Sequence, residues 1–199
     1  MDQIVKIYNK VAPEISKVYK QQSHIIGIDN FCKTLKPGSR ILDLGCGMGK
    51  DISIFSAKGF EAVGVDGSVG MIKQARRRYP NEKFFIMDVR RLKLPDSYFD
   101  AVWSWSVLTH LSNQDKKTVL TEVNRVLKKN GTFSQMVWRG RGLFINKDVY
   151  PRSHYLLSTS SWRKLYDETG FVDLETKIIK SIRRDSLRLT AKKLFPQAP

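Results

Sequence analysis

Residues 41–52 read ILDLGCGMGKDI, and this stretch joins a short apolar run to three closely spaced glycines. The run from Arg40 to Leu44 has the length and composition of a strand that is buried on both faces. Glycines at alternate positions let the backbone turn tightly and lie close to a ligand that a Cβ atom would hold away. The stretch therefore predicts a buried strand, a ligand-binding turn and then a helix.

Strands and helices alternate after this turn. Apolar runs predict strands over residues 61–65, 83–87, 99–104 and 132–137. Helical periodicity predicts helices over residues 49–58, 69–78 and 114–129. Such alternation is typical of a parallel sheet with helices on both faces.

The last forty residues depart from this alternation. A helix is expected over 160–169, and strands are expected over 171–179 and 187–194. The segment between these two strands is too short for a crossover helix, so they should pair antiparallel. The prediction is an α/β fold whose mainly parallel sheet contains one reversed strand.

The chain reads as a single domain over residues 1–199, because no repeat or linker divides it. Residues 1–35 predict a helical cap of two helices, with a break at Pro13. The net charge of +16 suggests an anionic partner. Two cysteines are too few for a disulfide framework or a cysteine-rich zinc site, so no metal is expected. With no signal peptide and no long apolar run, we expect a cytoplasmic protein without a membrane partner.

Acidic residues stand where two later strands end. Asp66 follows Gly45 by 21 residues, a spacing at which a carboxylate can accept both hydroxyls of an adenosine ribose. Asp88 ends the next strand and suits the exocyclic amine of adenine. A dinucleotide is disfavoured, because Lys50 stands where its fingerprint requires a third glycine.

Taken together, these motifs resemble the class I S-adenosylmethionine-dependent methyltransferases over residues 38–138. The resemblance rests on the glycine-rich segment 41–52, the strands ending at Asp66 and Asp88, and the segments 99–104 and 122–137. It implies a three-layer Rossmann-like sandwich with a seven-stranded, mainly parallel sheet whose last strand is antiparallel. It also implies S-adenosylmethionine as cofactor and S-adenosylhomocysteine as product.

The resemblance further implies a cofactor site. Its backbone around Gly45 would hold the methionine end, Asp66 the ribose, and Asp88 with Val89 the adenine. Residues 8–12, which resemble a segment that closes over the cofactor in small methyltransferases, add Tyr8. The implied cofactor-binding residues are Tyr8, Asp43, Gly45, Cys46, Gly47, Asp66, Gly67, Ser68, Met71, Asp88, Val89 and Ser104.

The acceptor site is expected beside the strand that ends near Ser104. His110 is the candidate base, because an ordinary histidine titrates near neutral pH. Residues 139–158 form the longest irregular segment and are the expected wall of the acceptor pocket. The candidate acceptor-binding residues are Trp105, Arg139, Arg141 and Arg152, whose guanidinium groups would suit an anion. Lys128 and Lys129, by contrast, are interpreted as the charged end of a helix on the far face.

Three functions remain open. The first is in-line methyl transfer to oxygen, nitrogen or sulfur of a small anionic metabolite. The second is methylation of RNA, for example of a tRNA base, with basic side chains holding phosphates. The third is a non-catalytic S-adenosylmethionine-binding partner protein. The sequence after residue 104 lacks the Asn/Asp-Pro-Pro-Tyr motif of enzymes that methylate amide or adenine nitrogens.

Overall fold

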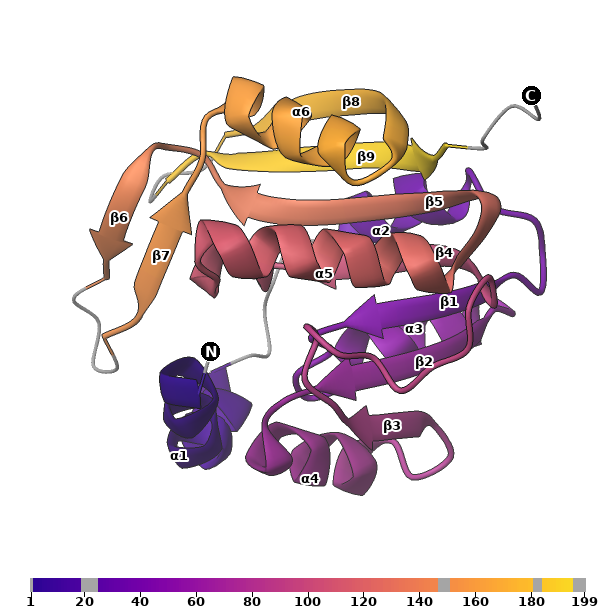
Figure 1. The fold of residues 1–199 in the computed structure, drawn as a ribbon. Coiled ribbons are helices and arrows are strands. Elements are labelled where there is room, and N and C mark those ends of the chain that lie inside the picture. Colours follow the sequence, from indigo (N-terminus) through magenta and orange to yellow (C-terminus); the bar gives the residue numbers. More distant parts are fainter. Residues whose placement is uncertain (1, 19–24, 147–150, 181–183, 195–199) are drawn as a thin grey trace.

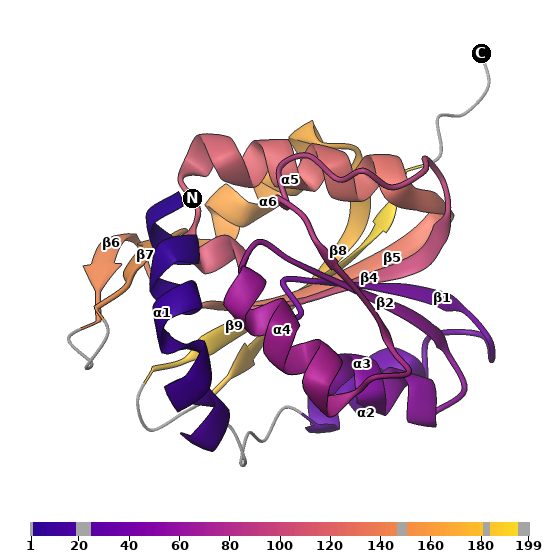
Figure 2. The same ribbon diagram turned by 90° about the horizontal axis from the view of Figure 1, so that it is seen from below.

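The computed structural model describes residues 2–18, 25–146, 151–180 and 184–194. It confirms the expected three-layer α/β sandwich, in which one seven-stranded sheet lies between two layers of helices (Figures 1 and 2). The strands of this sheet are β1 (Arg40–Leu44), β2 (Glu61–Asp66), β3 (Lys83–Ile86), β4 (Phe99–Trp105), β5 (Leu127–Trp138), β8 (Phe171–Ile179) and β9 (Ser186–Lys193). The helices are α1 (Asp2–Val18), α2 (Ile25–Cys32), α3 (Lys50–Ala57), α4 (Val69–Arg78), η1 (Leu108–His110), α5 (Asn113–Val126) and α6 (Thr159–Glu168).

The strands follow the order β3-β2-β1-β4-β5-β9-β8. The first five are parallel, and β9 runs antiparallel to both β5 and β8. The last strand of the chain is thus the reversed one, as predicted. This arrangement brings the carboxyl ends of β1, β2 and β4 to one edge of the sheet, where ligands bind in open α/β sheets.

Alternate residues of the central strands pack into two separate hydrophobic cores, one on each face of the sheet. Leu42 and Val102 pack with α5 and α6, whereas Ile41 and Trp103 pack with α2, α3 and α4. Because side chains alternate across a strand, a strand with a core on each face must be apolar at nearly every position. This requirement explains why β1 reads as a continuous apolar run interrupted only by Asp43.

Helix α1 differs from its prediction. The expected break at Pro13 is absent, and the helix runs unbroken through this proline. A proline inside a helix removes one backbone hydrogen bond and crowds the preceding turn. Packing offsets this cost, because Val11 and Ala12 are buried. Asn9 Oδ1 also accepts hydrogen bonds from Ser68 Oγ at 2.8 Å and from the Gly70 amide at 3.0 Å.

Two other expectations were wrong near β5. Helix α5 ends at Val126 rather than at residue 129, so Lys128 and Lys129 lie on the strand and are not a helix end. Lys128 forms an ion pair of 2.6 Å with Asp100 on β4. Residues 139–158 are not wholly irregular either, since they contain a hairpin of β6 (Gly142–Ile145) and β7 (Ser153–Leu156). Residues 147–150 of this segment lie outside the described part of the chain.

We predict that Asn9→Ala loosens α1 without unfolding the sheet. The variant loses both hydrogen bonds that Asn9 accepts from the start of α4, and each such bond contributes about 1 kcal/mol. Amide hydrogen exchange should therefore become faster in α1 and stay unchanged in β1 and β4. Lys10→Ala, at the exposed neighbouring position, is the control. Equal exchange in α1 of both variants would show that Asn9 does not anchor the helix.

Candidate functional site

The glycine turn after β1 has the left-handed backbone conformation that the motif predicts. Gly45 has a φ of 78° and Gly47 a φ of 52°. At Gly45 a Cβ atom would lie 2.1 Å from Val107 Cγ2, so only glycine fits there. At Gly47 a Cβ atom would meet nothing within 4 Å. The turn is thus packed against the protein at Gly45 and open at Gly47.

Asp66 ties the end of β2 to this turn. Its carboxylate accepts hydrogen bonds from the Gly47 amide at 3.0 Å and from the Ser68 amide at 2.8 Å. Burial raises the pKa of Asp66, and these two amides act in the opposite direction. Asp66 therefore lies at the centre of the turn as an acceptor of hydrogen bonds.

Two more carboxylates lie near the turn. Asp43, on β1, is buried, and its pKa is raised well above the ordinary value by burial and by the charges of Asp51 and Asp66. Asp51, on α3, accepts a hydrogen bond from the Trp103 indole at 2.8 Å. Three acids close together make this end of the site suitable for a cationic group.

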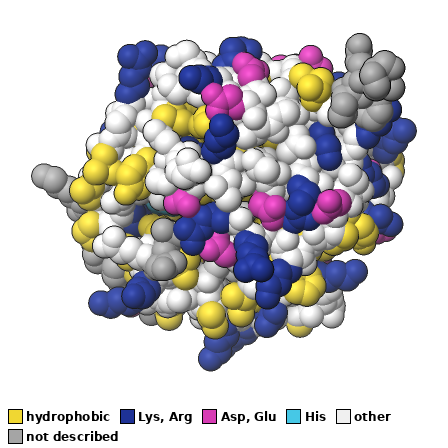
Figure 3. All heavy atoms as spheres, in the orientation of Figure 1, with side chains coloured by type: hydrophobic (Ala, Val, Ile, Leu, Met, Phe, Trp, Pro, Cys, Tyr) yellow, Lys and Arg dark blue, Asp and Glu magenta, His cyan; other side chains and the backbone are white. Residues whose placement is uncertain are grey.

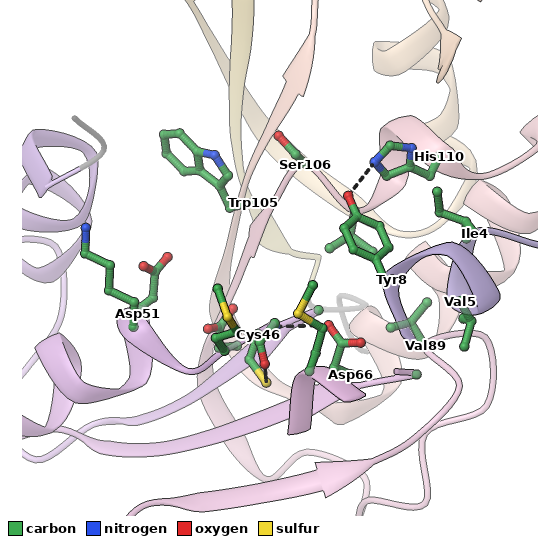
Figure 4. A pocket seen from close by; sticks show the side chains of 18 of the residues that line it. Ile4, Val5, Tyr8, Cys46, Asp51, Asp66, Val89, Trp105, Ser106 and His110 are labelled. Atoms are coloured by element: carbon green, nitrogen blue, oxygen red, sulfur yellow. Dashed lines mark hydrogen bonds between the residues drawn. The ribbon is translucent and has the colours of Figure 1, made fainter. Parts of the chain in front are cut away.

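A cavity of about 370 Å³ opens onto these acids (Figure 4). Its walls come from α1, the glycine turn, the end of β2 and the segment after β4. The sequence-predicted residues that line it are Tyr8, Asp43, Gly45, Cys46, Gly47, Asp66, Gly67, Met71, Val89, Trp105 and His110. The structure therefore brings together most of the predicted cofactor residues with two of the predicted acceptor residues.

Three predicted cofactor residues do not line the cavity. Ser104 donates its hydroxyl to the Leu44 carbonyl within the sheet at 3.0 Å. Ser68 caps α4, because its Oγ accepts the Met71 amide at 3.1 Å. Asp88 pairs with Arg90 at 2.7 Å. Although partial burial opposes ionisation, the hydrogen bonds from Arg90 lower the pKa of Asp88.

The predicted acceptor arginines separate into two groups. Arg139 and Arg141 lie in a different hollow, together with Ser158, Ser160 and Asp185. They do not line the cavity that contains His110. The prediction placed the whole 139–158 segment beside His110, whereas Arg139 directly follows β5 and its amide donates to the Asp185 carbonyl at 3.0 Å. Arg152 lies behind the cavity wall and donates from Nη1 to the Tyr8 hydroxyl at 3.3 Å.

Tyr8 and His110 lie next to one another in the wall of the cavity, as Figure 4 shows. Their hydroxyl and Nε2 atoms are 3.3 Å apart, and His110 Nδ1 lies 2.9 Å from the Ser153 carbonyl. A carbonyl only accepts, so Nδ1 carries the proton and Nε2 accepts from Tyr8. Burial lowers the pKa of His110 to about 4, so the ring is neutral at pH 7.

Sequence reasoning missed part of the lining. The additional residues are Ile4, Val5, Met48, Lys50, Asp51, Arg78, Tyr79, Ser106, Val107 and Leu111. Val107 and Leu111 could have been suspected, because they flank His110 in the segment after β4. Ile4 and Tyr79 carry no local signal, since only packing brings α1 and the end of α4 to the cavity. Among the described residues, no three His, Cys, Asp or Glu side chains form a group that could hold a metal ion.

Known proteins resemble this chain over the segment that contains the glycine turn. Residues 41–131 match a family model described as "Methyltransferase domain". The chain is 35% identical over 112 residues to 2-methyl-6-phytyl-1,4-hydroquinone methyltransferase of Synechocystis, covering 54% of the chain and 35% of that protein. It is 31% identical over 133 residues to probable tRNA methyltransferase 9B of Homo sapiens, covering 66% of the chain and 28% of that protein.

The chain thus spans about a third of the length of these two relatives. Among solved structures, it is similar to 1,6-didemethyltoxoflavin-N1-methyltransferase of Burkholderia thailandensis. The TM-score is 0.79 at 17% identity, and the match covers 96% of this chain and 88% of the other. That likeness shows the fold.

We predict that His110 makes the protein acid-sensitive. Its pKa is about 4 in the folded protein and near 6.5 in the unfolded chain, so only the unfolded chain binds a proton between these values. The stabilisation of up to about 3 kcal/mol that is present above pH 6.5 is therefore lost as the pH falls to 4.

Urea unfolding of the protein and of His110→Gln, at neutral pH and near pH 4, measures this effect. The variant should lose less stability on acidification, because it lacks one of the two buried imidazoles and no longer lowers the pKa of the neighbouring His154 through the charge of His110. Equal losses would contradict the assignment of a buried, neutral His110.

Proposed function

We propose that this chain, whose residues 41–131 match a methyltransferase domain model, transfers the methyl group of S-adenosylmethionine to a small acceptor. The observation that supports this function best is the cavity beside the glycine turn. Gly47 leaves open space where any side chain would project, and Asp66 lies at the rim of that space. A cofactor can therefore approach the backbone of the turn closely.

The residues around the turn fit this cofactor. When bound, S-adenosylmethionine supplies a methyl group on a positively charged sulfonium. The carboxylates of Asp43, Asp51 and Asp66 favour a cationic ligand at this end of the cavity. In our proposal Asp66 accepts the ribose hydroxyls, whereas Met71 and Val89 cover the adenine. Asp88 would reach the adenine only by leaving Arg90.

The acceptor end of the cavity is mainly apolar and aromatic. Its walls include Val107, Leu111, Trp105 and the aromatic ring of Tyr8. Such walls favour an acceptor with a flat or apolar part, which they would hold in one orientation and shield from water. Of the predicted arginines only Arg152 lies beside this wall, so a negative charge on the acceptor would be met there.

His110 remains the candidate proton acceptor, but its strength as a base is limited. Its Nε2 atom already accepts from Tyr8, so it could take a proton only if that hydrogen bond breaks, and a group with a pKa of about 4 is a weak base at pH 7. We therefore propose that the acceptor atom already carries a reactive lone pair at neutral pH, as an aromatic nitrogen or an ionised oxygen or sulfur does. The hydrogen bond from the Tyr8 hydroxyl then fixes the orientation of the two rings against the acceptor.

RNA methylation is the second candidate. It is favoured by the net charge of +16 and by the similarity to probable tRNA methyltransferase 9B. Retention of tRNA that falls steeply with salt would support it, since phosphate contacts release counterions. No retention at low salt would remove it. A non-catalytic partner protein, the third candidate, would bind the cofactor without turnover of any acceptor.

We predict that Asp66→Asn weakens binding of S-adenosylhomocysteine at least about tenfold, because hydrogen bonds to a charged acceptor contribute about 1.5–3 kcal/mol. Isothermal titration calorimetry measures the dissociation constant. Asp167→Asn, at an exposed position of α6, is the matched control and should bind as the unchanged protein does. An unchanged dissociation constant for Asp66→Asn, in a protein that still unfolds cooperatively, would refute the cofactor site.

A further inference from the structure

The hairpin of β6 and β7 has two unlike faces. One face carries Phe144, His154 and Leu156 and packs on Trp138 of β5. The rings of His154 and Trp138 stack with their centroids 4.0 Å apart. This face fixes the hairpin to the end of the main sheet, so its opposite face points away from the core.

The opposite face is apolar and open. Leu143, Ile145 and Tyr155 are 58%, 52% and 39% exposed. Leu143 and Tyr155 are direct partners in the strand register, so they lie side by side. Figure 3 shows hydrophobic side chains gathered at the left of the view, where Figure 1 draws β6 and β7. Single exposed apolar residues are common, but a cluster on a projecting hairpin indicates a binding surface.

Positive charge adjoins this apolar face. The described residues 139–146 and 151–158 contain three arginines and no acidic residue. Arg141 lines a hollow with Leu143 and Tyr155, and it also lines a second hollow with Arg139. Asp185, across from Arg139 at 3.7 Å, is the acidic residue that lines the second hollow. Aliphatic side chains and cations are thus presented together.

We propose that this hairpin face docks the protein onto the surface of an anionic lipid bilayer. The aliphatic side chains would enter the boundary between headgroups and acyl chains, and Arg141 beside them would lie among the lipid phosphates. The exposed pair Leu143 and Ile145 favours lipid over RNA, because RNA-binding surfaces present aromatic rings and cations rather than aliphatic tips.

Such docking would be peripheral. No helix in the described part of the chain is long and apolar enough to cross a membrane. The expectation of no membrane partner rested on that same criterion, which takes no account of a small apolar surface. The surface becomes visible only when the hairpin register places alternate residues of two strands on one face.

The hairpin also touches the cavity. The Ser153 carbonyl accepts a hydrogen bond from His110 Nδ1, and the Tyr155 carbonyl accepts one from Lys116 Nζ at 2.7 Å. The same ammonium group donates to the Leu111 carbonyl at 2.7 Å, at the end of η1. A bilayer bound to the hairpin would therefore lie close to the acceptor end of the cavity. The docking itself goes beyond methyl transfer and does not depend on it.

Vesicle sedimentation tests the proposal without any methyl acceptor. The full chain is mixed with vesicles of phosphatidylcholine alone or of phosphatidylcholine with phosphatidylglycerol. We expect binding to the anionic vesicles, and Leu143→Ser with Ile145→Ser should weaken it at least about tenfold. Ile86→Ser is the matched control, because Ile86 is 47% exposed on β3 at the opposite edge of the sheet. It should bind as the unchanged protein does.

Further measurements distinguish lipid binding by this face from RNA binding and from self-association. Arg141→Gln or added salt should reduce the preference for anionic vesicles. The proposal is overturned if the protein ignores both vesicles, or if the Ile86 control loses as much binding as the double variant. It is also overturned if the double variant abolishes retention of tRNA or self-association in gel filtration while vesicle binding is absent. Circular dichroism confirms that each variant is folded.

Discussion

Two backbone amides of the glycine turn, from Gly45 and Cys46, donate to the same carbonyl, that of Val65 on β2, at 2.7 and 3.0 Å. One residue further on, the Gly47 amide donates to the Asp66 carboxylate. These bonds join the ends of two neighbouring parallel strands before any ligand is present. The position of the turn, the start of α3 and the cap of α4 at Ser68 all depend on this junction. The site is therefore preorganised by the sheet, which lowers the ordering that binding must impose.

Local patterns were enough to predict the parts of the fold that are local. Strand β1, its glycines and Asp66 lie within one contiguous segment, and their spacing reflects a backbone geometry that few other residues allow. Pro13 failed as a helix break because its cost is offset by the packing of α1, which no local pattern contains. The prediction that Lys128 ends a helix failed for a similar reason, because Lys128 lies on β5 and pairs with Asp100 on β4. The separation of Arg139 from His110 likewise depends on strand register, because the Arg139 amide pairs with the Asp185 carbonyl.

The wall of the cavity at His110 combines groups from three distant segments. Tyr8 comes from the first helix, His110 from the segment after β4, and Arg152 from the start of β7. Lys116, fully buried under this arrangement, connects η1 to β7 through two carbonyls, and burial lowers its pKa to about 8. The chemistry of His110 follows from this enclosure, because a ring deprived of water and held by a carbonyl stays neutral. The residue type made His110 a candidate base, but it could not predict that burial lowers the pKa of this ring.

The contacts of Tyr8 also bear on how the protein is made. Its hydroxyl meets a side chain 102 positions later in the chain and another 144 positions later. Contacts of such sequence separation form late in folding, because a long loop must close first. During synthesis α1 precedes α4 and the glycine turn, so its buried residue Ala12 is covered only after Met48 and Met71 have been added to the chain. Among the elements that line the cavity, α1 is thus synthesised before the others and is among the last to be fixed in place.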